Sequence, residues 1–158
     1  MSTSIIIGIV IVASIILLFV MMSKNQSNKL NKKLLVINQF AENQGCVISE
    51  KEALMSNLIG IDSNAKRLFF INSDKNIEST FDLSNFKRCA MVERSRSAST
   101  NSGAQKVIEK IELSFSPISA GASTPTLEIY NTENGDFSLN GELQFCEKWV
   151  DIINSNLK

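Results

Sequence analysis

The sequence predicts an α+β protein in which an N-terminal single transmembrane helix precedes an antiparallel sheet of about seven strands and a C-terminal helix. Three observations carry this prediction: an uncharged apolar run over residues 5–22, period-two alternation between residues 46 and 130, and apolar residues spaced by three and four near the C-terminus. The first pattern is typical of a membrane span, the second of half-buried strands and the third of an amphipathic helix.

The apolar run at residues 5–22 has a length that fits a bilayer. Its 18 residues contain no charge, and as a helix they extend over roughly 27 Å. A cleaved signal peptide is the competing interpretation, but it requires a positive n-region and a small-residue cleavage site, and neither is present. We therefore expect residues 1–23 to be a retained anchor.

The charges next to the anchor predict its orientation. Residues 23–43 hold four lysines against one glutamate, a net charge of +3, while residues 44–158 hold 12 basic and 15 acidic side chains, a net charge of −3. The positive-inside rule places the lysine-bearing side in the cytoplasm. The expected localisation is the plasma membrane, as a single-pass protein with Met1 outside and the C-terminal domain inside.

Residues 24–45 are expected to form a juxtamembrane amphipathic helix. Leu30, Leu34, Ile37 and Ala41 recur at offsets of four, three and four, which gives one apolar stripe. Such a helix can lie on anionic headgroups or pack onto the folded domain. We favour packing onto the domain because Val36 and Phe40 widen the apolar face.

Residues 46–158 are expected to form one domain. A polar stretch at residues 95–103 is predicted to be a hairpin loop between two of its strands. The apolar and alternating segments predicted as strands are residues 46–48, 58–62, 67–71, 77–83, 86–94, 106–116 and 126–130.

The chain is predicted to end in a helix over residues 140–156. Leu143, Cys146, Val150 and Ile153 recur at helical spacing beside Trp149, and Asn140 suits the N-cap position. Because a tryptophan buries a large apolar area, we expect Trp149 to be the most important single residue of the core.

Composition argues against metal binding and against several kinds of catalysis. The chain has no histidine, and its three cysteines are far apart, so neither a structural zinc site nor a histidine-based acid–base pair is expected. Cys89 and Cys146 are predicted to be buried thiols. The acidic pairs Glu50/Glu52 and Glu109/Glu112 are predicted to be solvated surface carboxylates. We expect no enzyme activity and no cofactor, and the mildly acidic domain disfavours nucleic acid as a partner.

The order of about seven antiparallel strands and a tryptophan-bearing C-terminal helix resembles the pleckstrin-homology-like (PH-like) fold over roughly residues 46–157. In that fold a bent sheet or partly open barrel is closed at one end by the final helix. The chain also resembles small bacterial membrane-anchored PH-like proteins. The resemblance implies a binding or scaffolding role. Lipid-binding members carry a basic cluster between their first two strands, whereas residues 49–53 here are net acidic, which argues against phosphoinositide binding.

The predicted function is that of a cytoplasm-facing scaffold that binds a protein within a membrane complex. The alternative is a sensor of anionic lipid or of the membrane surface, which would use the basic juxtamembrane helix and the loop from Arg94 to Thr100. Both roles use exposed cations. The candidate interaction residues are Lys29, Lys32, Lys33, Lys87, Arg88, Arg94 and Arg96.

Overall fold

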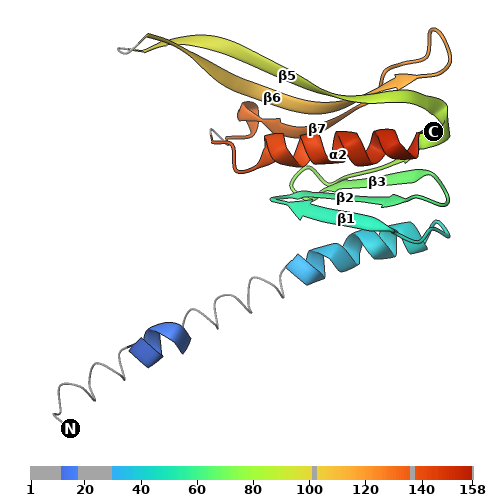
Figure 1. Ribbon diagram of the computed structural model, residues 1–158, viewed down its shortest axis with the longest axis horizontal. Coiled ribbons are helices and arrows are strands. Elements are labelled where there is room, and N and C mark those ends of the chain that lie inside the picture. Colours follow the sequence, from blue (N-terminus) through green and yellow to red (C-terminus); the bar gives the residue numbers. More distant parts are fainter. Residues whose placement is uncertain (1–11, 18–29, 101–102, 136–137, 158) are drawn as a thin grey trace.

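The computed structural model describes residues 12–17, 30–100, 103–135 and 138–157. Two antiparallel sheets form most of this part of the chain, with a long helix beside them (Figure 1). The four-stranded sheet contains β1 (Glu50–Leu54), β2 (Asn57–Asp62), β3 (Arg67–Asn72) and β4 (Ile77–Asp82). The three-stranded sheet contains β5 (Phe86–Thr100), β6 (Gly103–Pro117) and β7 (Thr126–Asn131). Two short 3-10 helices, η1 (Leu83–Asn85) and η2 (Thr132–Asn134), and the final helix α2 (Glu142–Asn156) follow in the chain, and residues 30–42 form a further helix before β1.

The predicted fold class is wrong in two respects. The strands form two separate sheets instead of one bent sheet or partly open barrel. Within the described residues, no helix has the length and apolar character needed to cross a membrane. Of the apolar run at residues 5–22, only residues 12–17 are described, and they are helical; the rest of the predicted anchor lies outside the described residues.

The four-stranded sheet is covered on both faces, which explains the continuous apolar runs of β2 and β3. Ile59, Ile61, Leu68 and Phe70 face the core between the sheets and pack with residues of β5, β6 and α2. The alternate residues Leu58, Phe69 and Ile71 face a helix over residues 30–42. A sheet with both faces buried needs apolar residues at successive positions.

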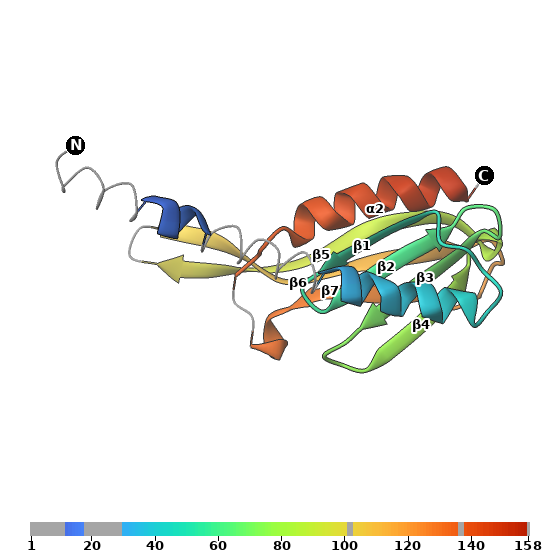
Figure 2. The same cartoon turned by 90° about the horizontal axis from the view of Figure 1, so that it is seen from below.

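The helix over residues 30–42 lies against the outer face of the four-stranded sheet, as Figures 1 and 2 show. Ile37 and Ala41 are completely buried there, and Phe40 meets Phe69 edge-on with 5.7 Å between the ring centroids. Packing onto the domain is therefore confirmed. The start of the stripe differs from the prediction, because Leu30 is exposed.

Several predicted strand boundaries are corrected by the structure. Residues 46–48 lie outside any strand, and the first strand is the charged segment Glu50–Leu54, which pairs with β2. The polar stretch at residues 95–103 is not a loop: most of it continues β5 and β6 as a long antiparallel hairpin, with a register shift after Arg94. Backbone pairing does not require apolar side chains, so strands of this kind escape a hydrophobicity pattern.

Helix α2 begins later than predicted. Its N-cap is Gly141, whose φ of +106° belongs to the left-handed region that glycine adopts without strain, and no side chain caps the helix there. Asn140 instead donates its backbone N–H to the carboxylate of Glu142. The core side of α2 matches the predicted stripe, since Cys146, Trp149 and Ile153 are buried.

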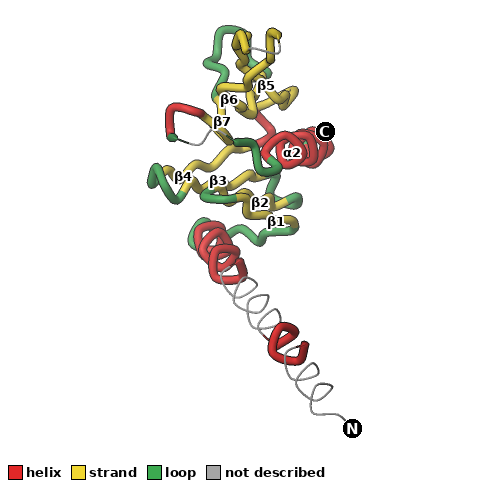
Figure 3. The backbone as a smooth tube through the Cα atoms, turned by 90° about the vertical axis from the view of Figure 1, so that its left-hand side faces the viewer, coloured by secondary structure: helices red, strands yellow, loops and turns green. Residues whose placement is uncertain are grey.

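Helix α2 bridges the two sheets along one side of the space between them (Figure 3). Trp149 Nε1 donates to Glu52 Oε2 of β1 at 2.8 Å. On the other sheet, the Asn154 side chain donates to the Cys89 carbonyl at 2.9 Å and accepts from the Cys89 N–H at 2.8 Å. Asn154 thus satisfies backbone groups on the free edge of β5, much as a neighbouring strand would.

Candidate functional site

The predicted basic residues do not form one site. Lys32 and Lys33 lie on the helix over residues 30–42, beneath the four-stranded sheet, whereas Arg94 and Arg96 lie on β5 in the other sheet (Figure 1). Lys29 lies outside the described residues. Lys87 and Arg88 are exposed at the start of β5. The six described candidates are therefore divided between the helix over residues 30–42 and strand β5 and do not form one cluster.

Two of these cations already have partners within the chain. Lys33 donates from Nζ to the Met55 carbonyl at 2.6 Å, which ties the helix to the β1–β2 turn. Arg96 forms an ion pair with Glu109, with 2.8 Å between Nε and Oε1. These contacts reduce the number of cations that are available to an anionic surface.

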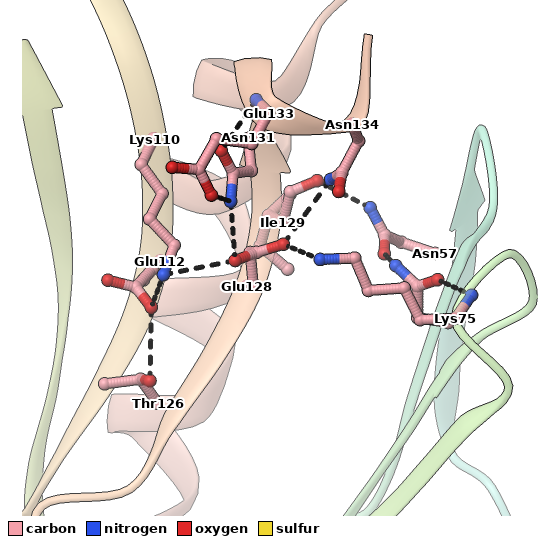
Figure 4. A network of polar contacts seen from close by, with 11 residues as sticks. Asn57, Lys75, Lys110, Glu112, Thr126, Glu128, Ile129, Asn131, Glu133 and Asn134 are labelled. Atoms are coloured by element: carbon pink, nitrogen blue, oxygen red, sulfur yellow. Dashed lines mark hydrogen bonds and ion pairs between the residues drawn. The ribbon is translucent and has the colours of Figure 1, made fainter. Parts of the chain in front are cut away.

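A polar network lies on the opposite side of the inter-sheet space from α2, where β7 approaches the turns of the four-stranded sheet (Figures 3 and 4). Its centre is Glu128 on β7. The Glu128 carboxylate pairs with Lys75 from the β3–β4 turn and with Lys110 of β6, whose Nζ is 3.1 Å away. Asn131 also donates to Glu128 at 3.1 Å. One carboxylate therefore links both sheets.

The charges in this network set its protonation state. Burial alone raises the pKa of Glu128, but hydrogen bonds from Lys75, Lys110 and Asn131 and the charge of Lys75 outweigh burial and lower that pKa to about 2. The hydrogen bond from Lys110 to Glu112, at 2.8 Å, together with its contacts to Glu128, raises the pKa of Lys110 against the opposing effect of burial. Both groups are charged at neutral pH.

Two buried asparagines continue the link between the sheets. Asn57 Nδ2 donates to the Ile129 carbonyl of β7 at 2.8 Å, and Asn72 Nδ2 donates to Asn57 Oδ1 at 2.8 Å. The Lys75 backbone N–H donates in turn to Asn72 Oδ1 at 2.9 Å. Each side chain is held by the next, so the lining of this region is fixed by hydrogen bonds before any ligand arrives.

A cavity of about 420 Å³ opens beside this network, between the β1–β2 and β3–β4 turns on one side and β7 with η2 on the other. We call it the β7 cavity. Its volume falls within the range of about 300–1,000 Å³ that is usual for ligand pockets. The polar side chains in its wall include Asn57, Asn72, Asp74, Lys75, Glu128 and Glu142. A smaller groove of about 270 Å³ lies along β7 on the other side of Lys75 and Glu128.

Glu142 is the most deeply buried charged residue of the β7 cavity, with 3% of its surface exposed. It sits in the first turn of α2, where the helix dipole favours a negative charge. Its carboxylate accepts the Asn140 backbone N–H. No ion pair links Glu142 to a cation among the residues that the structure describes.

Sequence reasoning missed the β7 cavity because its residues lie far apart in the chain. The signal was present only in part: single asparagines at the strand ends Asn57 and Asn72, and Glu128 within an apolar strand, are polar residues at positions where burial is expected. Glu52 was predicted to be a solvated surface carboxylate, but its carboxylate accepts hydrogen bonds from the side chains of Trp149 and Lys148. Pairings between distant strands decide these contacts.

The three cysteines are buried free thiols, as predicted for Cys89 and Cys146. Burial raises the pKa of each of these two thiols to about 12, so neither is a thiolate at neutral pH. No group of three or more cysteine, aspartate or glutamate side chains that could hold a metal ion occurs in the described ranges.

Comparison with known proteins gives no relative: no family model, no curated protein and no solved structure matches this chain.

Proposed function

We propose that this chain is a binding module that holds a partner protein at the β7 cavity and does not catalyse a reaction. The observation that carries the proposal is a cavity of about 420 Å³ whose polar wall is fixed in advance by the Asn57–Asn72 pair and the Glu128 network. Sites whose groups are already held in place lose less conformational freedom on binding.

The chemistry of the wall supports binding over catalysis. Amides, carboxylates and one lysine predominate among its polar groups, and the carboxylate of Glu128 is fully engaged by cations and amides. A general base needs a pKa near the working pH, whereas the pKa of Glu128 is about 2. The binding role also agrees with the role that the PH-like resemblance implies, and that resemblance stays a prediction.

The alternative role as a sensor of anionic lipid gains no support from the arrangement of the cations. The helix that carries Lys32 and Lys33 lies below the four-stranded sheet, far from strand β5, which carries Arg94 and Arg96 (Figure 1), and Arg96 is paired with Glu109. Attraction to an anionic surface grows with the number of cations that face it together.

Site-specific photo-crosslinking tests the proposal. A photoreactive phenylalanine analogue is placed at Ser56 or Asn134, which line the β7 cavity, and at Glu147 or Asp151, which are exposed on α2. The full chain is irradiated in cells that produce it naturally. We expect the same discrete heavier product from both cavity positions and none from the α2 positions.

Equal products from all four positions, or products only from α2, would contradict the proposal. Because each variant replaces a single residue that is exposed or half-buried, its fold is checked by urea unfolding before irradiation.

A further inference from the structure

The wall of the β7 cavity contains more negative than positive charge, and it contains hydrogen-bond acceptors that can receive further donors. Its wall contains three carboxylates, from Asp74, Glu128 and Glu142, and one ammonium group, from Lys75. Lys75 is already paired with Glu128. Asp74 and Glu142 form no ion pair with any described residue. The wall of the cavity therefore carries a net charge of −2.

Glu142 makes this imbalance significant, because it is a buried group. A carboxylate removed from water is stabilised by a cation or by several hydrogen bonds. Here 97% of the residue surface is covered, while among the described residues the carboxylate receives one backbone N–H, from Asn140, and the field of the α2 N-terminus. It faces a cavity with room for a further group.

The remaining acceptors in the wall match a group with several donors. From the described residues, Asn57 Oδ1 accepts one hydrogen bond, donated by Asn72, although an amide oxygen has two lone pairs. Asp74 offers an exposed carboxylate at the rim. An ammonium group has three donors and a guanidinium group has five, and neither has an acceptor. An anionic ligand, in contrast, would meet only Lys75, which Glu128 already occupies.

We infer that the β7 cavity receives the cationic end of a lysine or arginine side chain that the partner protein presents. This inference rests on the proposed function, because it names the chemistry of the partner at the same cavity. Asp74 at the rim attracts the cation, and Glu142 at depth binds it. The flexible apolar stem of such a side chain passes the half-buried Ser56 and the exposed Met55 at the rim.

Titration of the isotope-labelled full chain with three short blocked peptides tests the inference by two-dimensional NMR. The peptides are acetyl-Gly-Lys-Gly-amide, acetyl-Gly-Arg-Gly-amide and the uncharged acetyl-Gly-norleucine-Gly-amide, whose side chain has the apolar stem of lysine without the ammonium group. We expect the lysine and arginine peptides to shift the amide resonances of Asn72, Asp74 and Glu128. The norleucine peptide is expected to leave these resonances unchanged.

Charge-neutralising variants locate the bound cation. Glu142→Gln and Asp74→Asn should each weaken binding of the lysine peptide about tenfold, the effect of losing one charge-assisted hydrogen bond. The matched controls Glu147→Gln and Asp151→Asn change exposed acids on α2 and should leave the affinity unchanged. Because Asp74 is exposed, its variant remains informative even where Glu142→Gln lowers the stability of the fold.

Equal binding of the norleucine peptide, equal losses in the control variants, or shifts located outside the cavity would each overturn the inference. These outcomes are separate from a failure of the proposed function. If crosslinks form at Ser56 and Asn134 but the charged peptides do not bind better than the norleucine peptide, the cavity is still the docking site. The inference that it receives a basic side chain is then rejected. The absence of crosslinks at both positions rejects the proposed function itself.

Discussion

The two sides of the space between the sheets are closed in different ways. On the α2 side, Phe145, Cys146, Trp149 and Ile153 pack directly into the core, and polar contacts such as that of Asn154 with Cys89 lie at the margins. On the β7 side, ion pairs and amide hydrogen bonds connect the sheets and leave a cavity. Apolar packing without voids maximises stability, whereas a polar wall with an open volume leaves acceptors for a ligand. The comparison supports our proposal that one side stabilises the fold and the other binds a partner.

The largest expected effect is on the α2 side. Trp149→Ala removes the largest fully buried side chain and leaves Glu52 without its indole donor, so the free energy of unfolding should fall by about 3–5 kcal/mol. Urea unfolding measures this change. Lys148→Ala removes the exposed partner of the same carboxylate and should cost less than about 1 kcal/mol. If both variants lower the free energy of unfolding by similar amounts, packing of Trp149 in the core is not the main source of stability on this side.

A smaller loss is expected when the amide link on the β7 side is broken. Asn57→Ala leaves the Ile129 carbonyl and the Asn72 side chain without a buried partner, which should lower the free energy of unfolding by about 1–3 kcal/mol. Asn64→Ala, in the exposed β2–β3 turn, is the matched control and should stay within about 0.5 kcal/mol of the parent. A loss as large as that of Trp149→Ala would remove the contrast between the two sides.

Acid should weaken the β7 side by protonating Glu128. The pKa of Glu128 is about 2 in the folded chain, against an ordinary value of 4.5, so its ion pairs stabilise the fold above pH 4.5. That contribution is lost as the pH falls from 4.5 towards 2, because protonation of Glu128 abolishes its ion pairs. The expected loss is about 1 kcal/mol. Glu128→Gln should show a flatter dependence of the unfolding free energy on pH over this range, and an unchanged slope would contradict the role of the network.

The smallest effect is expected in thiol reactivity on the α2 side. Burial holds the pKa of Cys89 and of Cys146 at about 12, so both should resist iodoacetamide at pH 8 in the folded chain. Mass spectrometry after denaturant is added should show both thiols modified. Rapid modification of Cys146 in the folded chain would indicate that α2 detaches from the sheets, and the two sides would then differ less than their packing implies.

The spacing of apolar residues along the sequence correctly predicted the helices and strands that bury one or both of their faces. The hairpin expected from residues 58–62 and 67–71 matches β2 and β3 within one residue, and the helical stripe around Trp149 matches α2. Each of these elements buries side chains at a regular period, and such a period is visible in a single segment.

Elements held by distant partners could not be predicted in this way. Strand β1 is charged and is identified only by its pairing with β2. The β7 cavity depends on Asn57, Lys75 and Glu128, which meet only after both sheets have formed. The predicted membrane span depended on residues 5–22, of which only residues 12–17 are described, and no described helix is long and apolar enough to cross a membrane. Polar contacts between remote segments leave no periodic signal.

Amide hydrogen exchange tests the division between the two sides most directly. It is measured on the full chain alone and on the full chain mixed with the partner that photo-crosslinking identified, purified without irradiation. Binding at the β7 cavity predicts slower exchange in β7, in η2 and around Asn72, with unchanged exchange in α2 beyond its first turn, which carries the lining residue Glu142. Slower exchange in α2 with no change around the cavity would contradict it.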